Sequence, residues 1–462
     1  MDIDPKGLYK DFEKLHPIDT TRVDPPRMDI LADCMTDFSG DRTYYAPAIF
    51  PFMMPMEYTG WRDEQLAWQL TCAFSVNINS GEFLEIKGPD ATTFLKKYLV
   101  HDFEKFPIGT SKFGLQLATN GDVCSIGVII RTAEDAYETF WLELKSFFEA
   151  DMAKEPFDAT LTDRTGKIYI FQLMGPRSLE ILEDLTGDDL HDVKYATFRD
   201  SAIDGKKVRI YRFGMSNGLG YEIHGDRSDA PDVYRKVIEI GNAYGIRRLG
   251  LIAYMSSHTP GGYQQGQYQR HHEPPIDYLT NILAGSAGPD MDKRYMNPYE
   301  LGLGHVVNFN HDFIGKEALL AYLKDTGPKR TLVTLEWNAE DIADIYHSQF
   351  RDEVPYSPID MMVPTDHGGY RGDTMDLIFD TNGKEIGISG GRTISYFHRV
   401  MLSFGYIEEE YTSLGTDVVV LWGNVGSRQK EIRAKVVPTP YNTRFDNRTF
   451  DVEAITHRYP KK

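Results

Sequence analysis

The sequence contains few cysteines and no long run of apolar residues. Its three cysteines, Cys34, Cys72 and Cys124, lie far apart and form no CxxC pair. This spacing is not that of a disulfide scaffold or a thiolate zinc site, and it suits a reducing compartment. No stretch of about 18 uninterrupted apolar residues is present to span a membrane, and the charged N-terminus has no apolar leader. We therefore expect a cytoplasmic protein without a membrane-spanning segment.

Positive charge is also scarce. The chain of 462 residues has 50 Lys and Arg against 69 Asp and Glu, a formal net charge of −19. A negative field of this size repels polyanions, which argues against a general binder of nucleic acid or of acidic membranes. A small anionic ligand remains compatible with local positive charge. We expect a small-molecule partner, and the sequence does not fix the oligomeric state.

The phosphate-binding P-loop motif is missing. The RHHE stretch at 270–273 places two histidines side by side, where they diverge, and no HExxH motif accompanies them. A polar loop without a metal is the better interpretation. The GISGGR stretch at 387–392 joins two predicted strands, so we expect a turn or bulge there and not a phosphate cradle.

The sequence contains an internal repeat of two segments. FLEIKGPDATTFLKKYL at 83–99 and IFQLMGPRSLEILEDLT at 170–186 share one layout, an apolar strand, Gly-Pro and an amphipathic helix. The helical spacing of the apolar residues recurs in both copies. Two related strand–helix units that face each other predict a central cleft.

Other segments have weaker signals. Residues 1–60 are predicted to form an irregular arm, and residues 62–70 and 230–244 to form helices. Residues 251–263 are interpreted as a strand that gives way to a loop, with Tyr254 at the strand end. Residues 306–323 are interpreted as the end of a strand and the start of a helix.

After about residue 327 the pattern changes to short alternating strands separated by turns. Asn382-Gly383 is a strong hairpin signal within them. The sequence therefore predicts an α+β protein with an arm (1–60), a central region (61–326) and a C-terminal β-rich unit (327–462).

The glycine-rich stretch SNGLGYEIHGD contains an acid on a predicted strand. By strand alternation, Glu222 and His224 face one side, whereas Tyr221 and Ile223 face the other. A carboxylate in this position points either to water or to a hydrogen-bond donor, and exposure is the more common case. From the residues alone, the chain is predicted to be a globular protein with a cleft.

The paired strand-GP-helix units, GLGYEIHG and VVNFNHDFIGKEAL together resemble the glycine-cleavage T-protein superfamily. Within it, WRDEQLAW, AYMSSHTPGGY, TLEWNAEDIADIYHSQF and TDVVVLWGN are most similar to the tetrahydrofolate-dependent aromatic O-demethylases that act on vanillate and 3-O-methylgallate. The resemblance covers about residues 40–440. It implies a T-protein-like folate-binding fold followed by an antiparallel β-barrel.

The resemblance implies tetrahydrofolate as the cofactor. By position, Glu222 would hold the guanidine-like N–H edge of the pterin ring, because two parallel N–H···O bonds match a carboxylate. Gln172 would add an amide contact, and Tyr221 would lie beside the folate. Tyr263 occupies the position of a family tryptophan and would supply an aromatic wall.

The implied reaction moves the methyl group of an aryl methyl ether to N5 of tetrahydrofolate. Tyr254 matches the family's catalytic tyrosine, and a tyrosine with a pKa of about 10 is suited to protonate a departing phenolate. Lys145 falls where the family has an arginine for the substrate carboxylate, and it could act as a point charge. Asn77 and Tyr45 would contact the substrate.

Two departures from the family pattern matter. Ile126 stands where the aminomethyltransferases have an acid, which disfavours aminomethyl transfer. The strand SVNINSG lacks the family's glutamine and histidines. Three readings therefore stay open: a demethylase of a vanillate-like methoxyaromatic acid, a demethylase of a sulfonium, betaine or methylenedioxy compound, and a non-catalytic folate-binding protein.

Overall fold

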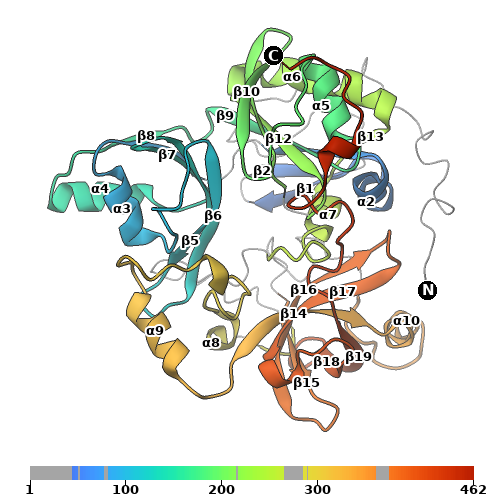
Figure 1. The fold of residues 1–462 in the computed structure, drawn as a ribbon. Coiled ribbons are helices and arrows are strands. Elements are labelled where there is room, and N and C mark those ends of the chain that lie inside the picture. Colours follow the sequence, from blue (N-terminus) through green and yellow to red (C-terminus); the bar gives the residue numbers. More distant parts are fainter. Residues whose placement is uncertain are drawn as a thin grey trace.

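The computed structural model describes residues 44–49, 52–77, 82–214, 217–264, 285–288, 290–359 and 374–461. They form three bodies, two open sheets with helices and a barrel, set around a common centre (Figure 1). Within those ranges, no helix has the length and apolarity needed to cross a bilayer. The RHHE stretch at 270–273 lies outside the described residues.

The first body is an antiparallel five-stranded sheet in the order β5-β6-β7-β4-β8, with α3 and α4 packed on it. Apolar residues of α3 and of the strands meet in one core, in which Phe94 contacts Phe148 of α4 edge-on. The elements of this body are β4 (Phe83–Lys87), α3 (Ala91–Tyr98), β5 (Thr110–Leu117), β6 (Val123–Ala133), β7 (Ala136–Phe140), α4 (Lys145–Lys154) and β8 (Thr160–Asp163).

The second body is a six-stranded sheet in the order β10-β11-β12-β9-β3-β13, in which the β13–β3 pair is parallel. Helices α5 and α6 cover one face and bury the main apolar core. The other face meets the first body, where Ile168 and Ile170 pack with Phe140. The elements are β3 (Cys72–Asn77), β9 (Ile168–Met174), α5 (Ser178–Thr186), β10 (Phe198–Ile203), β11 (Lys206–Tyr211), β12 (Gly220–Asp226), α6 (Ala230–Gly241) and β13 (Ile246–Arg248).

The predicted repeat of two strand–helix units is confirmed: the units are β4–α3 and β9–α5. The glycine that leaves each strand has nearly the same conformation, with φ of 135° at Gly88 and 131° at Gly175. A Cβ at Gly175 would lie 2.5 Å from the Thr71 carbonyl oxygen, and one at Gly88 would lie 2.5 Å from that of Asp158. Both glycines are therefore required by backbone contact as well as by φ.

The predicted β-rich unit is a closed barrel in the order β14-β17-β16-β15-β18-β19. Asn382-Gly383 turns between β15 and β16, as expected, and GISGGR contains a register shift between Gly390 and Thr393. Helix α10 (Ala339–Ser348) packs beside the barrel. The strands are β14 (Arg330–Trp337), β15 (Asp376–Phe379), β16 (Glu385–Ser395), β17 (Val400–Glu408), β18 (Asp417–Trp422) and β19 (Lys430–Val437).

Helix α2 (Trp61–Leu70) is confirmed, and three local predictions are wrong. Within 1–60, β1 (Tyr44–Ile49) pairs with β2 (Phe52–Glu57), and the aromatic residues of these segments favour strands. The run after Gly250 is a helix, α7 (Leu251–Ser256). Residues 304–306 form a 3-10 turn and no strand, although α9 (Lys316–Lys324) follows as predicted.

The last part of the chain, residues 440–461, leaves the barrel and returns to the second body, and we call it the C-terminal strap (Figure 1). The buried Arg212 side chain donates hydrogen bonds to Asn447 Oδ1 at 3.0 Å and to the Phe450 carbonyl at 2.9 Å. Asn447 Nδ2 donates to the Gly220 carbonyl at 3.0 Å. The strap thereby holds the first residue of β12.

Gly175→Ala is expected to lower the free energy of unfolding by about 3 kcal/mol or more, because it adds a backbone clash to a strained φ. Gly205→Ala is the matched control, since φ there is +79° and no heavy atom lies within 4 Å. It should cost about 1–2 kcal/mol. Urea denaturation measures both, and equal losses would contradict the role assigned to backbone contact.

Candidate functional site

A row of polar side chains crosses the second sheet on the face toward the first body. Tyr211, Glu222, Gln172 and Ser75 are direct cross-strand partners on β11, β12, β9 and β3. Partners in an antiparallel ladder point to the same face, so the four side chains lie side by side. All four are buried. A buried polar row of this kind needs hydrogen-bond partners.

The Glu222 carboxylate has a partner on each oxygen. Gln172 Nε2 donates to Oε1 at 2.8 Å, and His224 Nε2 lies 2.7 Å from Oε2. In this row, Gln172 Oε1 and Ser75 Oγ have no hydrogen-bond partner among the residues that the structure describes. A ligand ring with several N–H groups along one edge would fit this row. The residues present therefore suit a pterin.

Helix α7 carries Tyr254, which is 8% exposed and packs with Trp61, Leu66 and Phe397. The helix begins at Gly250, whose N–H donates to Glu64 Oε2 at 2.8 Å. Glu64 Oε1 also accepts from the Thr59 N–H at 2.8 Å. The fully buried Glu64 side chain of α2 therefore fixes the start of the helix that presents Tyr254.

His258 lies between Tyr254 and Tyr263, with ring centroids 5.0 Å and 5.8 Å away. Its Nδ1 donates to the carbonyls of Tyr254 and Met255, so Nε2 carries the lone pair. Burial lowers the pKa of His258 to about 4, and the ring is neutral near pH 7. Burial, together with the nearby Tyr254 and Glu222, holds the pKa of Tyr263 well above its usual value.

The first body closes the other side of this site. Phe113 on β5 meets Tyr263 edge-on at 5.4 Å, and Phe140 on β7 meets His224 at 5.5 Å. Ser111 Oγ is hydrogen-bonded to the Tyr211 hydroxyl. Residues of the first body therefore contact the candidate site from the facing sheet. The central cleft stays a prediction.

The structure brings Glu222, Gln172, Tyr254 and Tyr263 together, whereas Tyr221 and Lys145 lie elsewhere. Tyr221 points to the opposite face and is fully buried in the core under α5 and α6, so the prediction that it lies beside folate is corrected. Strand alternation requires this, because Tyr221 adjoins Glu222 along β12.

Lys145, which was predicted to bind the substrate carboxylate, also lies away from the candidate site. It begins α4, and its Nζ forms an ion pair with Asp163 at 2.8 Å on the outside of the first body. That hydrogen bond raises the pKa of Lys145. Asn77 ends β3 opposite Ile170, and Tyr45 lies in β1 opposite Pro55; for both, the structure describes the backbone.

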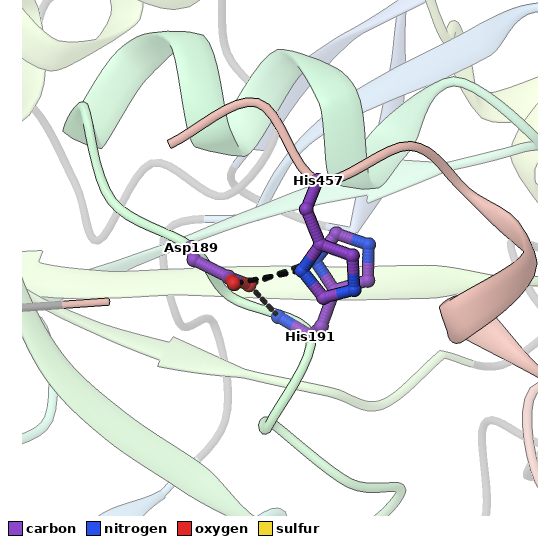
Figure 2. A group of neighbouring side chains, drawn as sticks. All are labelled: Asp189, His191 and His457. Atoms are coloured by element: carbon purple, nitrogen blue, oxygen red, sulfur yellow. Dashed lines mark hydrogen bonds and ion pairs between the residues drawn. The ribbon is translucent and has the colours of Figure 1, made fainter. Parts of the chain in front are cut away.

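One group among the described residues has ligand atoms within 4.8 Å of one another, Asp189, His191 and His457 (Figure 2). The two imidazoles are stacked, with centroids 3.7 Å apart and planes 19° apart. A histidine binds a metal in its ring plane at about 2.0–2.1 Å, and two rings stacked face to face at 3.7 Å cannot both hold one ion in their planes.

Asp189, His191 and His457 instead attach the end of the C-terminal strap to the second body, and we call this group the clasp. His457 Nδ1 lies 2.8 Å from Asp189 Oδ2, and its Nε2 lies 2.9 Å from Glu453 Oε2. Carboxylates accept from both nitrogens, and the hydrogen bond to Asp189 raises the pKa of His457. The geometry is that of an imidazolium held by carboxylates.

Several residues of the site were not predicted. His224 could have been found, since it shares the face of Glu222 by alternation. Tyr211 and Ser75 join the row through strand register, which no local pattern encodes. Ser111, Phe113 and Phe140 come from the other sheet, and His258 follows a helix that the sequence did not reveal.

Comparisons with known proteins identify the family of the chain. Residues 44–271 match the model of the GCVT N-terminal domain. A sesamin methylene transferase from Sinomonas sp. is 35% identical over 433 residues, which cover 88% of this chain and 94% of that protein. The chain belongs to the GCVT family.

Two further relatives place the chain within the family. A syringate O-demethylase from Sphingobium sp. is 29% identical and covers 86% of this chain and 91% of its own length. An aminomethyltransferase from Thermotoga maritima is 27% identical, with 67% of this chain and 76% of its own length covered. These matches confirm an enzyme of one-carbon transfer with tetrahydrofolate as its cofactor, as predicted.

The fold is confirmed by a solved structure. The aminomethyltransferase T of the glycine cleavage system from Bartonella henselae superimposes with a TM-score of 0.65 at 19% identity, covering 88% of this chain and 96% of that one. The α+β T-protein-like fold with its C-terminal barrel is therefore as the sequence predicted.

Burial raises the pKa of Glu64 to about 7. Because the native state holds this proton more tightly than the unfolded chain, Glu64 stabilises the fold most at low pH, and that contribution is lost as the pH rises from about 4.5 to 7. As the pH rises from about 4.5 to 7, the free energy of unfolding of the wild type should fall relative to that of Glu64→Gln. Urea titrations at pH 4.5, 6 and 8 measure it, and parallel profiles would contradict the raised pKa.

Proposed function

We propose that the enzyme moves a one-carbon group from an aromatic ether to N5 of tetrahydrofolate, with Tyr254 as the general acid. The observation that carries the proposal is the buried Glu222–Gln172 pair, in which Gln172 Oε1 is an unused acceptor, near Tyr254 and Tyr263. The pair suits the N–H edge of a pterin. The buried tyrosines suit an aromatic donor.

When bound, tetrahydrofolate supplies the nucleophilic nitrogen. The chain's own residues then have three tasks. Glu222 and Gln172 orient the acceptor by hydrogen bonds to its ring, and the burial of both side chains limits the access of water to them. Tyr254 donates its phenolic proton to the oxygen that leaves when the carbon–oxygen bond breaks, so that the donor departs as a neutral phenol.

Two donor classes are compatible with this chemistry. A vanillate-like methoxyaromatic acid was the first expectation, and it needs a cation for its carboxylate. Lys145 does not support that donor, since it is paired with Asp163 outside the site. A methylenedioxyphenyl compound needs no carboxylate partner, and the sesamin methylene transferase is 35% identical to this chain. We favour the neutral methylenedioxy donor and retain the methoxyaromatic acid as the second candidate.

Tyr254→Phe is expected to bind tetrahydrofolate normally and to lose about 10²–10⁴-fold in turnover, because the leaving oxygen is no longer protonated. Tyr221→Phe is the matched control, since its hydroxyl is buried on the opposite face of the sheet. It should keep near-wild-type turnover. Calorimetric folate binding and single-turnover rates measure both, and an unchanged rate in Tyr254→Phe would rule out the general-acid role.

The donor classes are separated by their products. Incubation with tetrahydrofolate and 3,4-methylenedioxybenzene compounds should yield 5,10-methylenetetrahydrofolate and a catechol, both detected by liquid chromatography and mass spectrometry. Vanillate would instead yield 5-methyltetrahydrofolate and protocatechuate. Turnover of vanillate with a KM that rises in Lys145→Ala would favour the acid donor. Folate binding without consumption of methoxyaromatics, methylenedioxy compounds, sulfoniums or betaines would favour a non-catalytic folate-binding protein.

A further inference from the structure

His224 is the second partner of the Glu222 carboxylate. Its Nε2 lies 2.7 Å from Glu222 Oε2, and both side chains are about 7% exposed. A carboxylate has no proton to give, so the imidazole nitrogen is the donor in this bond. The two residues are separated by one position on β12 and share one face of the sheet.

The His224 ring is itself held from two sides. Phe140 of the first body lies edge-on at 5.5 Å, and Tyr211 on β11 lies at 5.7 Å with its ring inclined by 67°. The cross-strand neighbour of His224 is Arg209, whose Nη1 is 2.5 Å from Glu138 Oε2 on β7. The imidazole is therefore fixed where the two sheets meet.

These two contacts use only part of the hydrogen-bond acceptor capacity of the Glu222 carboxylate. Each carboxylate oxygen has two acceptor positions. Gln172 occupies one on Oε1 and His224 occupies one on Oε2, which leaves one position on each oxygen. One free position on each oxygen is what a bidentate pair of parallel N–H donors requires.

We propose that His224 is a positioning residue that locks the Glu222 carboxylate in the orientation needed to bind the pterin N–H edge through both oxygens. This inference rests on the proposed function. Without the imidazole donor, the carboxylate is held by Gln172 alone and can rotate about its last bond. Pre-orientation of a buried binding group mainly lowers the cost of binding.

The test compares His224→Leu, which removes the donor, with His224→Gln, which retains an N–H donor. His224→Leu should raise the Kd for tetrahydrofolate about tenfold, the usual effect of losing one supporting hydrogen bond. It should raise the KM for tetrahydrofolate in proportion, with kcat at saturation within about twofold. His224→Gln should restore most of the affinity. Tetrahydropterin, which lacks the benzoyl-glutamate part, should show the same ratio.

A double-mutant cycle separates positioning from a structural effect. In the Glu222→Gln background, His224→Leu should cause no further loss of affinity, because the group that it orients is already altered. Equal and additive losses, or an unchanged Kd in His224→Leu, would overturn the inference. If His224→Leu does not fold, Phe140→Leu loosens the same ring and should raise the Kd by a smaller factor.

The outcome for Glu222→Gln keeps the two proposals apart. A loss of folate affinity in Glu222→Gln with none in His224→Leu overturns the positioning role and leaves the proposed function standing. Unchanged affinity in Glu222→Gln overturns the pterin contact itself and the positioning role with it.

Discussion

The burial of one carboxylate constrains much of this structure. Glu222 is 7% exposed in the middle of a sheet, and a buried charge is tolerated where hydrogen-bond donors surround it. Those donors come from the neighbouring strand through Gln172 and from the same strand through His224. A slip of β12 by one residue relative to β9 would turn Glu222 and His224 to the apolar face and away from Gln172. The sheet register and the polar row are therefore mutually dependent.

A second buried acid, Glu64, fixes the helix that carries Tyr254. Glu64 accepts N–H groups from the turn before α2 and from Gly250 at the start of α7. Helix α7 has few residues and would be marginal by itself, because helix nucleation is costly. The position of Tyr254 thus depends on α2 packing beside it, and the carboxylates of Glu64 and Glu222 support two different parts of the candidate site.

The features that the sequence could predict are local ones. The strand-GP-helix units, the hairpin at Asn382-Gly383 and the barrel strands depend on turn chemistry and on short-range periodicity, and all are found. The apolar run at 251–256 is too short for periodicity to separate strand from helix, and the Glu64 cap that decides it lies far away in sequence. The roles of Glu222, Gln172, Tyr254 and Tyr263 came from the family resemblance, and the geometry supports their grouping. Lys145 came from a weak local match, and its partner Asp163 could not be foreseen without the packing of β8. His224 lay within reach of simple alternation.

The C-terminal strap has a consequence for how the protein is made. Asn447 holds the carbonyl of Gly220, and the clasp at Asp189 and His457 secures the end of the same segment. Asn447 lies 227 residues after Gly220, so the ribosome produces the strap long after β12. During synthesis, the first residue of the strand that carries Glu222 therefore lacks this hydrogen bond until the strap has been made. A deletion within residues 440–461 would act on the candidate site from a segment that is far away in the sequence.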